Sequence, residues 1–313
     1  MNAKQNFLET IRFGKPEYVA MSNEPIWFGF SFEEISKMET WTDRWQVRWD
    51  LELEGMVPFP KGNPLADINN VYDYIFPDPD TLVLSDKTKR ELLQAKQDGK
   101  MIMGQMSYFV FERAWALVGM ENFLIAMIEN PNEINFLLKG VADYAKRVFE
   151  RYVELGADCV SFSEDLGSQR ALMMSPTLFR EYLLPRYDDC FRDLIKNGTL
   201  INFHSCGCIE DIVSDLANIG VHILNPIQAK ANDLKKLKEI SQGRIVLSGG
   251  IDTHTLMTGT AEQVRIETLR VLEILKPGGG YILSPDQFLP DMPVENMNMM
   301  WETCKSYGKY SYE

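Results

Sequence analysis

Side chains that bind soft metal ions stand close together at the end of an apolar run in the middle of the chain. The run Thr199–Phe203 leads directly into a segment that contains His204, Cys206 and Cys208. Strand side chains alternate between two faces, so His204 and Cys206 share one face while Phe203 lies on the other. Imidazole nitrogen and thiolate sulfur suit Zn²⁺, and a catalytic zinc needs only three protein ligands. The spacing therefore predicts a zinc site; the alternative is a strand-end histidine with two packed cysteines.

The third ligand of this site has more than one candidate. Cys208 lies two residues beyond Cys206, where the next helix is expected to begin. Asp286 follows the apolar run Tyr281–Ser284, and its parity places it on the same inward face as Ser284. Parity and position after a strand favour Asp286 as the third metal ligand, with its neighbour Gln287 and with Cys208 as alternatives.

Two adjacent carboxylates follow another apolar run. The run Cys159–Ser163 continues into Glu164 and Asp165. By alternation Asp165 points inward with the serines, while Glu164 needs a bulge or a turn to join it. Such a pair can act as acid and base, ligate a metal or hold a substrate, so both are candidate catalytic residues. A helix-capping or loop carboxylate pair is the alternative.

The elements that must position these residues alternate along the chain. Short β-like runs are followed by amphipathic runs that end near glycines, which predicts parallel strands with helical crossovers. Eight strands and the lack of an early Gly-x-Gly-x-x-Gly turn favour one (β/α)8 TIM-type barrel over residues 1–313, with active-site residues just after its strands. The irregular segment Trp41–Leu84 is expected to form an insertion or lid. The predicted strands are Tyr18–Ser22, Trp45–Trp49, Met101–Met106, Cys159–Ser163, Leu200–His204, His222–Leu224, Ile245–Ser248 and Tyr281–Ser284. The predicted helices are Ala3–Arg12, Asn132–Leu155, Pro176–Lys196, Ile209–Asn218, Leu234–Ile240 and Ala261–Leu275.

Composition excludes several classes of partner. The chain has 313 residues, with 32 basic and 45 acidic side chains and a net charge of −13. This charge opposes binding to nucleic acid or to anionic membranes. No run approaches the roughly 18 apolar residues of a membrane helix, and no apolar signal core begins the chain. The five cysteines lack disulfide-framework spacing, so thiol or metal roles in a reducing cytoplasm are expected.

Four stretches of the chain resemble one known family. They are Phe7–Val19, Ile201–Gln228, Ser248–Thr253 and Pro290–Asn296. Together they resemble the uroporphyrinogen decarboxylase superfamily, in particular its branch of methyltransferases that act with corrinoid proteins. The resemblance implies a TIM barrel with a catalytic zinc, held by a His-x-Cys pair after one strand and by a Cys or His after the last. His204 and Cys206 match the pair, whereas the last position reads Asp286-Gln287.

The predicted function follows from the residues and the resemblance together. A zinc-dependent enzyme is expected to move a methyl group between a small methylated, in particular methoxylated, compound and the cobalt of a separate corrinoid protein. Zinc would act as a Lewis acid on the methyl-bearing oxygen or on a thiol acceptor. Trp27 and Tyr108, which follow early strands, and Asn225, within the resembling stretch, are the substrate-binding candidates.

Two other functions stay open. Uroporphyrinogen decarboxylase itself calls for an arginine-rich segment after the first strand, where this chain has the acidic and aromatic segment Glu24–Phe30. A catalytically silent barrel that binds a corrinoid or tetrapyrrole partner is the third interpretation, because the last strand lacks the Cys or His that the resemblance implies.

Overall fold

A curled parallel sheet forms the centre of the protein. The computed structural model describes residues 1–30, 40–51, 58–289 and 291–312. Their eight-stranded sheet has the order β1-β11-β10-β9-β8-β7-β6-β2, and all its neighbouring strands are parallel. The strands are β1 (Ala20–Met21), β2 (Ile26–Phe28), β6 (Ile102–Met106), β7 (Cys159–Ser163), β8 (Leu200–His204), β9 (Ile223–Ile227), β10 (Val246–Ile251) and β11 (Tyr281–Pro285). Since β1 and β2 end the sheet on opposite sides but are separated only by residues 22–25, the sheet curls round into a TIM-like barrel.

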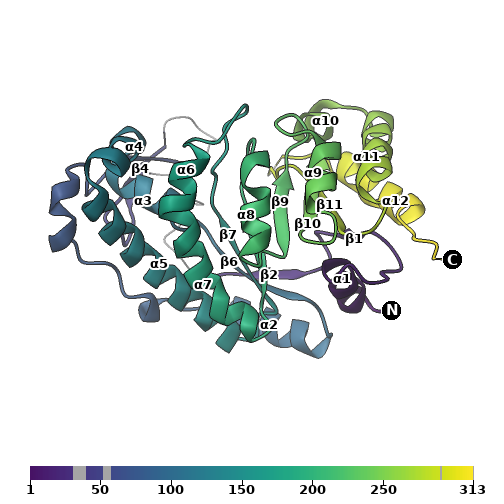
Figure 1. Cartoon of the computed structure of the whole chain (residues 1–313). Helices are drawn as coiled ribbons and strands as arrows, with labels where there is room; N and C mark the ends of the chain where they lie inside the picture. Colours follow the sequence, from purple (N-terminus) through teal and green to yellow (C-terminus); the bar gives the residue numbers. More distant parts are fainter. Residues whose placement is uncertain (31–39, 52–57, 290, 313) are drawn as a thin grey trace.

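Helices cover the outer face of the barrel in chain order (Figure 1). The predicted helices are present, but that over Pro176–Lys196 is interrupted by a π-helical turn, Phe179–Leu183, and that over Ile209–Asn218 starts with a 3-10 turn, Glu210–Ile212. Pro185 lacks the backbone N–H that a regular helix would use here, which explains the interruption. No helix among the described residues is long and apolar enough to cross a membrane. The α-helices are α1 (Ala3–Ile11), α2 (Asp86–Gln97), α3 (Phe111–Val118), α4 (Met120–Glu129), α5 (Pro131–Glu154), α6 (Pro176–Leu178), α7 (Leu184–Lys196), α8 (Val213–Asn218), α9 (Leu234–Ser241), α10 (Thr253–Thr258), α11 (Ala261–Leu275) and α12 (Val294–Tyr307).

The prediction that Trp45–Trp49 is a barrel strand is wrong. In the structure, β4 (Arg48–Asp50) lies between β3 (Trp41–Thr42) and β5 (Phe59–Gly62) in a separate antiparallel sheet. The missing place in the barrel is taken by β2. Aromatic and alternating residues favour a strand of either kind, so local pattern did not distinguish the two sheets.

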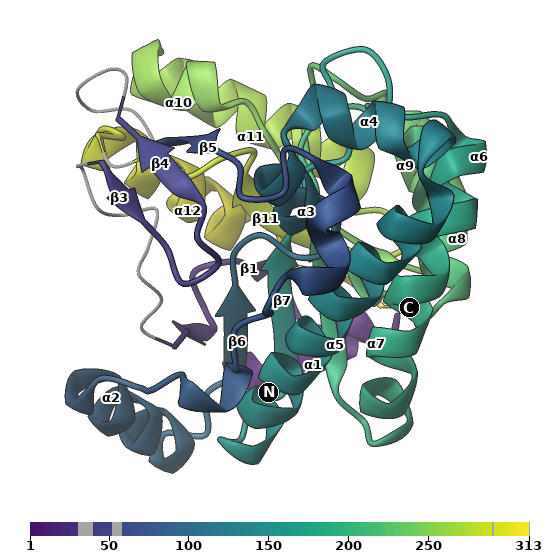
Figure 2. The same ribbon diagram turned by 90° about the vertical axis from the view of Figure 1, so that its left-hand side faces the viewer.

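The antiparallel sheet confirms the predicted insertion, and one buried carboxylate fastens it to the barrel. Asp43 accepts hydrogen bonds from the backbone N–H groups of Trp45 and Val47 and from the Trp49 indole, at 2.9, 3.0 and 3.0 Å. It also pairs with Arg113 of α3 at 2.7 Å. In Figure 2 this sheet lies at the end of the molecule toward which β6 and β7 point. The insertion therefore stands at the carboxyl-terminal end of the strands.

The interior of the barrel changes from apolar to polar along the strands. At the starts of the strands, Cys159, Ile223 and Val246 pack with Phe7 and Ile11 of α1 in one cluster, so this helix closes that end. Further along, the inward positions are the buried polar residues Ser161, Asn202, Ser248 and Ser284. Period-two alternation then carries the same faces on to Asp165, His204 and Asp286. Among the described strands, the inward polar groups named here therefore gather toward the end opposite α1.

Candidate metal centre

Three potential metal ligands meet beyond the carboxyl ends of β7 and β8. Asp165, His204 and Cys206 each offer a ligand atom, and these atoms all lie within 4.8 Å of one another. His204 Nε2 is 3.6 Å from Cys206 Sγ and 3.7 Å from Asp165 Oδ1. The side chains of His204 and Asp165 are 31% and 38% exposed, so a small molecule can reach them. Nitrogen, sulfur and oxygen donors in this arrangement are able to hold a divalent metal ion with an open position.

The loop after β8 is held in place by side chains from the next crossover. Gly207 has a φ of +84°, and a Cβ there would meet the Gly167 carbonyl oxygen at 2.2 Å, so the position requires glycine. Gln228 accepts the Gly207 N–H at 2.8 Å, and Asn232 donates to the Gly207 carbonyl at 2.9 Å. Asp165 itself accepts the Cys206 N–H at 2.8 Å. These bonds fix Cys206 beside His204.

The electrostatics of this cluster suit a cation. Burial raises the pKa of the Cys206 thiol, and the nearby carboxylates Asp165 and Glu112 raise it further. A bound divalent cation acts in the opposite direction, because it stabilises the thiolate and neutralises the carboxylates. The residues present therefore fit a soft or borderline metal ion.

Asn225 lies beside the histidine on the neighbouring strand. The register pairs His204 of β8 with Asn225 of β9, and His204 Nδ1 is 2.9 Å from Asn225 Oδ1. The amide of Asn225 also reaches Ser248 Oγ of β10 at 3.5 Å. The described contacts of its side chain are therefore with the metal-site histidine and with a barrel serine, and its substrate contact stays a prediction.

The two adjacent carboxylates have different surroundings. Glu164 is completely buried and accepts hydrogen bonds from the N–H groups of Val110, Phe111 and Glu112 at 3.1, 2.6 and 3.1 Å, and from the Tyr187 hydroxyl. Burial raises the pKa of Glu164 to about 7, although the hydrogen bonds from these donors act to lower it. It thus caps the N-terminus of α3, where the N-cap residue Val110 has no capping side chain. Asp165 is therefore the carboxylate of this pair that belongs to the ligand cluster. Glu164 has no exposed surface that a substrate can touch.

The other predicted ligands stand outside this cluster. Asp286 is 6% exposed, and its oxygens accept the N–H groups of Gly250 at 2.8 Å and Ala229 at 3.4 Å. Burial raises the pKa of Asp286 to about 7. Cys208 is half-buried and Gln287 is exposed. The carboxylate that the structure groups with His204 and Cys206 is therefore Asp165, and a ligand role for Asp286 stays a prediction.

The two aromatic substrate candidates differ in exposure. Trp27 of β2 is 39% exposed. Tyr108 is half-buried, has a left-handed φ of +56°, and donates a hydrogen bond from its backbone N–H to Ser163 Oγ at 2.9 Å. Its ring lies 5.0 Å from the ring of Trp49, edge to face. Tyr108 therefore connects the insertion to the end of β7, and a substrate contact of either ring stays a prediction.

Glu112 belongs to the surroundings of the cluster, and the sequence analysis missed it. This residue of α3 is 8% exposed, and its Oε2 atom has no hydrogen-bond partner in the described part of the chain. Burial raises the pKa of Glu112 well above its usual value, and Asp165 and Glu164 add to the effect. Helical pattern alone gave no signal for it, because it lies in a run of buried aromatic and aliphatic residues.

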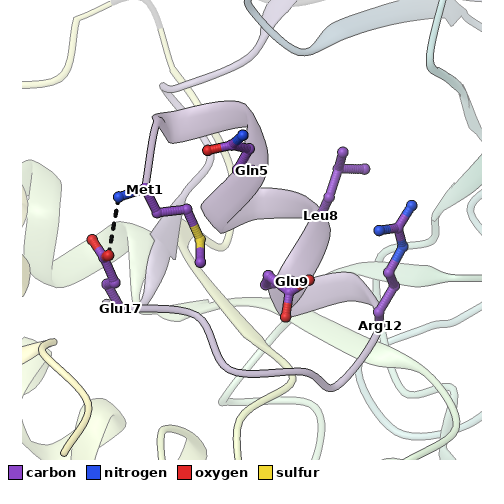
Figure 3. A pocket seen from close by; sticks show the side chains of 6 residues that line it. All are labelled: Met1, Gln5, Leu8, Glu9, Arg12 and Glu17. Carbon is purple, nitrogen blue, oxygen red and sulfur yellow. Dashed lines mark hydrogen bonds and ion pairs between the residues drawn. The ribbon is translucent and has the colours of Figure 1, made fainter.

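A hollow on the described surface lies away from the metal ligands. A depression of about 480 Å³ beside α1 is lined by Met1, Gln5, Leu8, Glu9, Arg12 and Glu17 (Figure 3). In this hollow the N-terminal amine of Met1 forms an ion pair with Glu17 at 3.0 Å. Because α1 closes the starts of the strands, this hollow is at the opposite end of the barrel from the metal ligands.

Comparison with known proteins agrees with this architecture. The structure is similar over 98% of this chain and 99% of the other to a methyltransferase from Methanosarcina mazei, with a TM-score of 0.79 and 17% sequence identity. A B12-independent methionine synthase from Shewanella sp. W3-18-1 is matched over 74% of this chain and 68% of its own, with a TM-score of 0.49 and 11% identity. No curated protein matches the sequence. The family model named uroporphyrinogen decarboxylase (URO-D) matches residues 84–307, which is well over half of the chain, and the protein therefore belongs to the URO-D family.

Proposed function

We propose that this protein is a zinc-dependent methyltransferase that moves a methyl group between a small methoxylated compound and the cobalt of a corrinoid carried by a partner protein. The observation that carries the proposal is the cluster of Asp165, His204 and Cys206 at the carboxyl end of the barrel. Membership of the URO-D family and the full-length likeness to a methyltransferase structure support it.

The donor atoms are the reason for proposing zinc. Imidazole nitrogen, thiolate sulfur and carboxylate oxygen are all common zinc ligands, and three of them leave one position for a substrate. Zinc bound there would supply Lewis acidity toward a methyl-bearing oxygen or an acceptor thiol. On distance we assign Asp165 as the third ligand in place of Asp286, whose two oxygens already accept backbone N–H groups.

The residues around the ligands favour a substrate without several negative charges. Carboxyl groups of Asp165, Glu112 and Asp286 lie close enough to Cys206 to raise the pKa of its thiol, so the surroundings of the ligands are acidic. Arg113, the cation next to Glu112 in the sequence, is already paired with Asp43. An octa-carboxylate porphyrinogen would meet repulsion here. This arrangement supports methyl transfer over uroporphyrinogen decarboxylation.

Spectroscopy of the corrinoid tests the proposal. The purified protein is mixed with a corrinoid protein in its Co(I) form and with a methoxylated aromatic compound, and methylation of the cobalt is followed by absorbance. We expect methylation that requires the wild-type protein and is lost with His204→Ala. Decarboxylation of uroporphyrinogen by the same preparation would assign the other activity. Metal binding without either reaction for any methylated compound tried would favour the silent barrel.

A further inference from the structure

We infer that Asn225 is the positioning residue of the metal centre: its side-chain oxygen holds the His204 ring so that Nε2 is the atom presented to the metal. The inference rests on the proposed metal-dependent function. It differs from the substrate-binding role expected from the sequence, because it places the amide of Asn225 against a ligand instead of against the substrate.

The contact between the two side chains fixes the state of the ring. An amide oxygen only accepts hydrogen bonds, so at 2.9 Å the Nδ1 atom of His204 must carry the proton. The neutral ring then has its lone pair on Nε2. This is the atom that lies 3.6 Å from Cys206 Sγ and 3.7 Å from Asp165 Oδ1. The hydrogen bond thus directs the lone pair into the ligand cluster.

Asn225 is itself held by its other neighbour. Its Nδ2 atom donates to Ser248 Oγ at 3.5 Å, and Ser248 is buried on β10. His204, Asn225 and Ser248 therefore form a row across three adjacent strands. If the amide were turned round, its NH₂ group would face Nδ1 and the ring proton would move to Nε2. A metal ion at Nε2 would then have to displace that proton and break the contact with the amide, so the observed orientation of Asn225 favours metal binding.

A matched control residue stands on the adjacent strand. Asn202 lies on β8 two residues before His204, faces the barrel interior and is 3% exposed. Its Nδ2 atom donates to Ser161 Oγ at 2.8 Å, one layer below the ligands. Both substitutions remove the same amide group from neighbouring strands, but of these two asparagines it is Asn225 whose side chain contacts His204 in the described structure.

Metal affinity measures the inference directly. Zn²⁺ affinity is determined by competition with a chromophoric chelator, and Co²⁺ spectra report the ligand geometry, for wild type, Asn225→Ala, Asn225→Asp and Asn202→Ala. Loss of a hydrogen bond to a ligating histidine typically weakens metal binding by about 10–100-fold. We expect this loss, with an altered Co²⁺ spectrum, in Asn225→Ala alone. Asn225→Asp keeps an acceptor opposite Nδ1, and a carboxylate there raises the basicity of the ring, so its metal affinity should be at least that of wild type.

The outcomes separate this inference from the proposed function. Circular dichroism and melting of each metal-free variant show whether it is folded, and the Asn225→Asp rescue applies even if Asn225→Ala is unstable. Wild-type affinity in Asn225→Ala overturns the inference while the metal site stands. So does an equal loss in Asn202→Ala, or an Asn225→Asp variant whose metal binding is lost. If the wild-type protein binds neither Zn²⁺ nor Co²⁺, the metal-dependent function fails and this inference fails with it.

Discussion

The two ends of the barrel are built from the same strands but do different work. At the starts of the strands, apolar residues such as Cys159, Ile223 and Val246 pack against Phe7 and Ile11 of α1 and exclude water. At the carboxyl ends, Asp165 and His204 are about one-third exposed and gather potential ligands. The difference teaches that burial at one end supplies the stability that lets the other end keep reactive, partly solvated groups. Substitutions at the two ends should therefore separate folding from function.

The largest effect is expected from removing a ligand at the carboxyl end. Cys206→Ala and His204→Ala should reduce the zinc content from about one ion per chain to almost none, because two remaining donors hold zinc weakly. Cys208→Ser should keep its zinc, since that thiol is outside the ligand cluster. Elemental analysis of the purified variants checks this. Equal zinc in wild type and Cys206→Ala would contradict the site.

The next effect concerns the adjacent carboxylates. Asp165→Asn should lower turnover by on the order of 10²–10⁴, the usual worth of a positioned carboxylate. Zinc content should fall with it if Asp165 is the third ligand, and a full zinc complement would instead make it the proton carrier. Asp286→Asn serves as the comparison: loss of zinc there, with retention in Asp165→Asn, would restore Asp286 as the ligand.

At the opposite end, the expected effect is on folding. Phe7 is 2% exposed and packs against the residues at the starts of the barrel strands. Phe7→Ala should lower the free energy of unfolding by about 3–5 kcal/mol through the cavity it leaves. Denaturant titration gives the stability, and zinc content of the folded fraction should remain that of wild type. A folded Phe7→Ala protein that has lost its metal would show that the two ends are not independent.

The smallest expected effect is a gain in stability close to the site. Glu112 is buried with one oxygen unpartnered, and burial raises its pKa. A carboxyl group whose pKa is raised in the folded state binds its proton more tightly there than in the unfolded chain. Its contribution to stability is therefore lost as the pH rises above its ordinary pKa of 4.5.

Glu112→Gln cannot ionise, so it should be more stable than wild type by about 1–3 kcal/mol above neutral pH and gain little at pH 4. Chemical unfolding at several pH values measures the difference between the two proteins. A gain that does not change with pH, or a loss of stability at high pH, would show that the carboxylate is satisfied in the folded protein.

Local patterns in the sequence were enough for much of the barrel. The strands β7, β8, β10 and β11 and the helix Ala261–Leu275 follow from alternation, amphipathicity and glycine stops, because period two and period 3.6 are properties of the chain over a few residues. The same period placed His204, Cys206 and Asp165 on inward faces, and it indicated that Glu164 would need a turn to join them.

What only the tertiary structure decided are the contacts between segments far apart in the chain. The local sequence does not show that β2 completes the barrel while Trp45–Trp49 does not, because both segments have residues that suit a strand. Glu164 caps a helix that begins more than fifty residues earlier, and Asn225 meets His204 through the register of two strands. Alternation says which face a side chain is on, but the neighbours on that face are set by strand order and register, which depend on the packing of the whole chain.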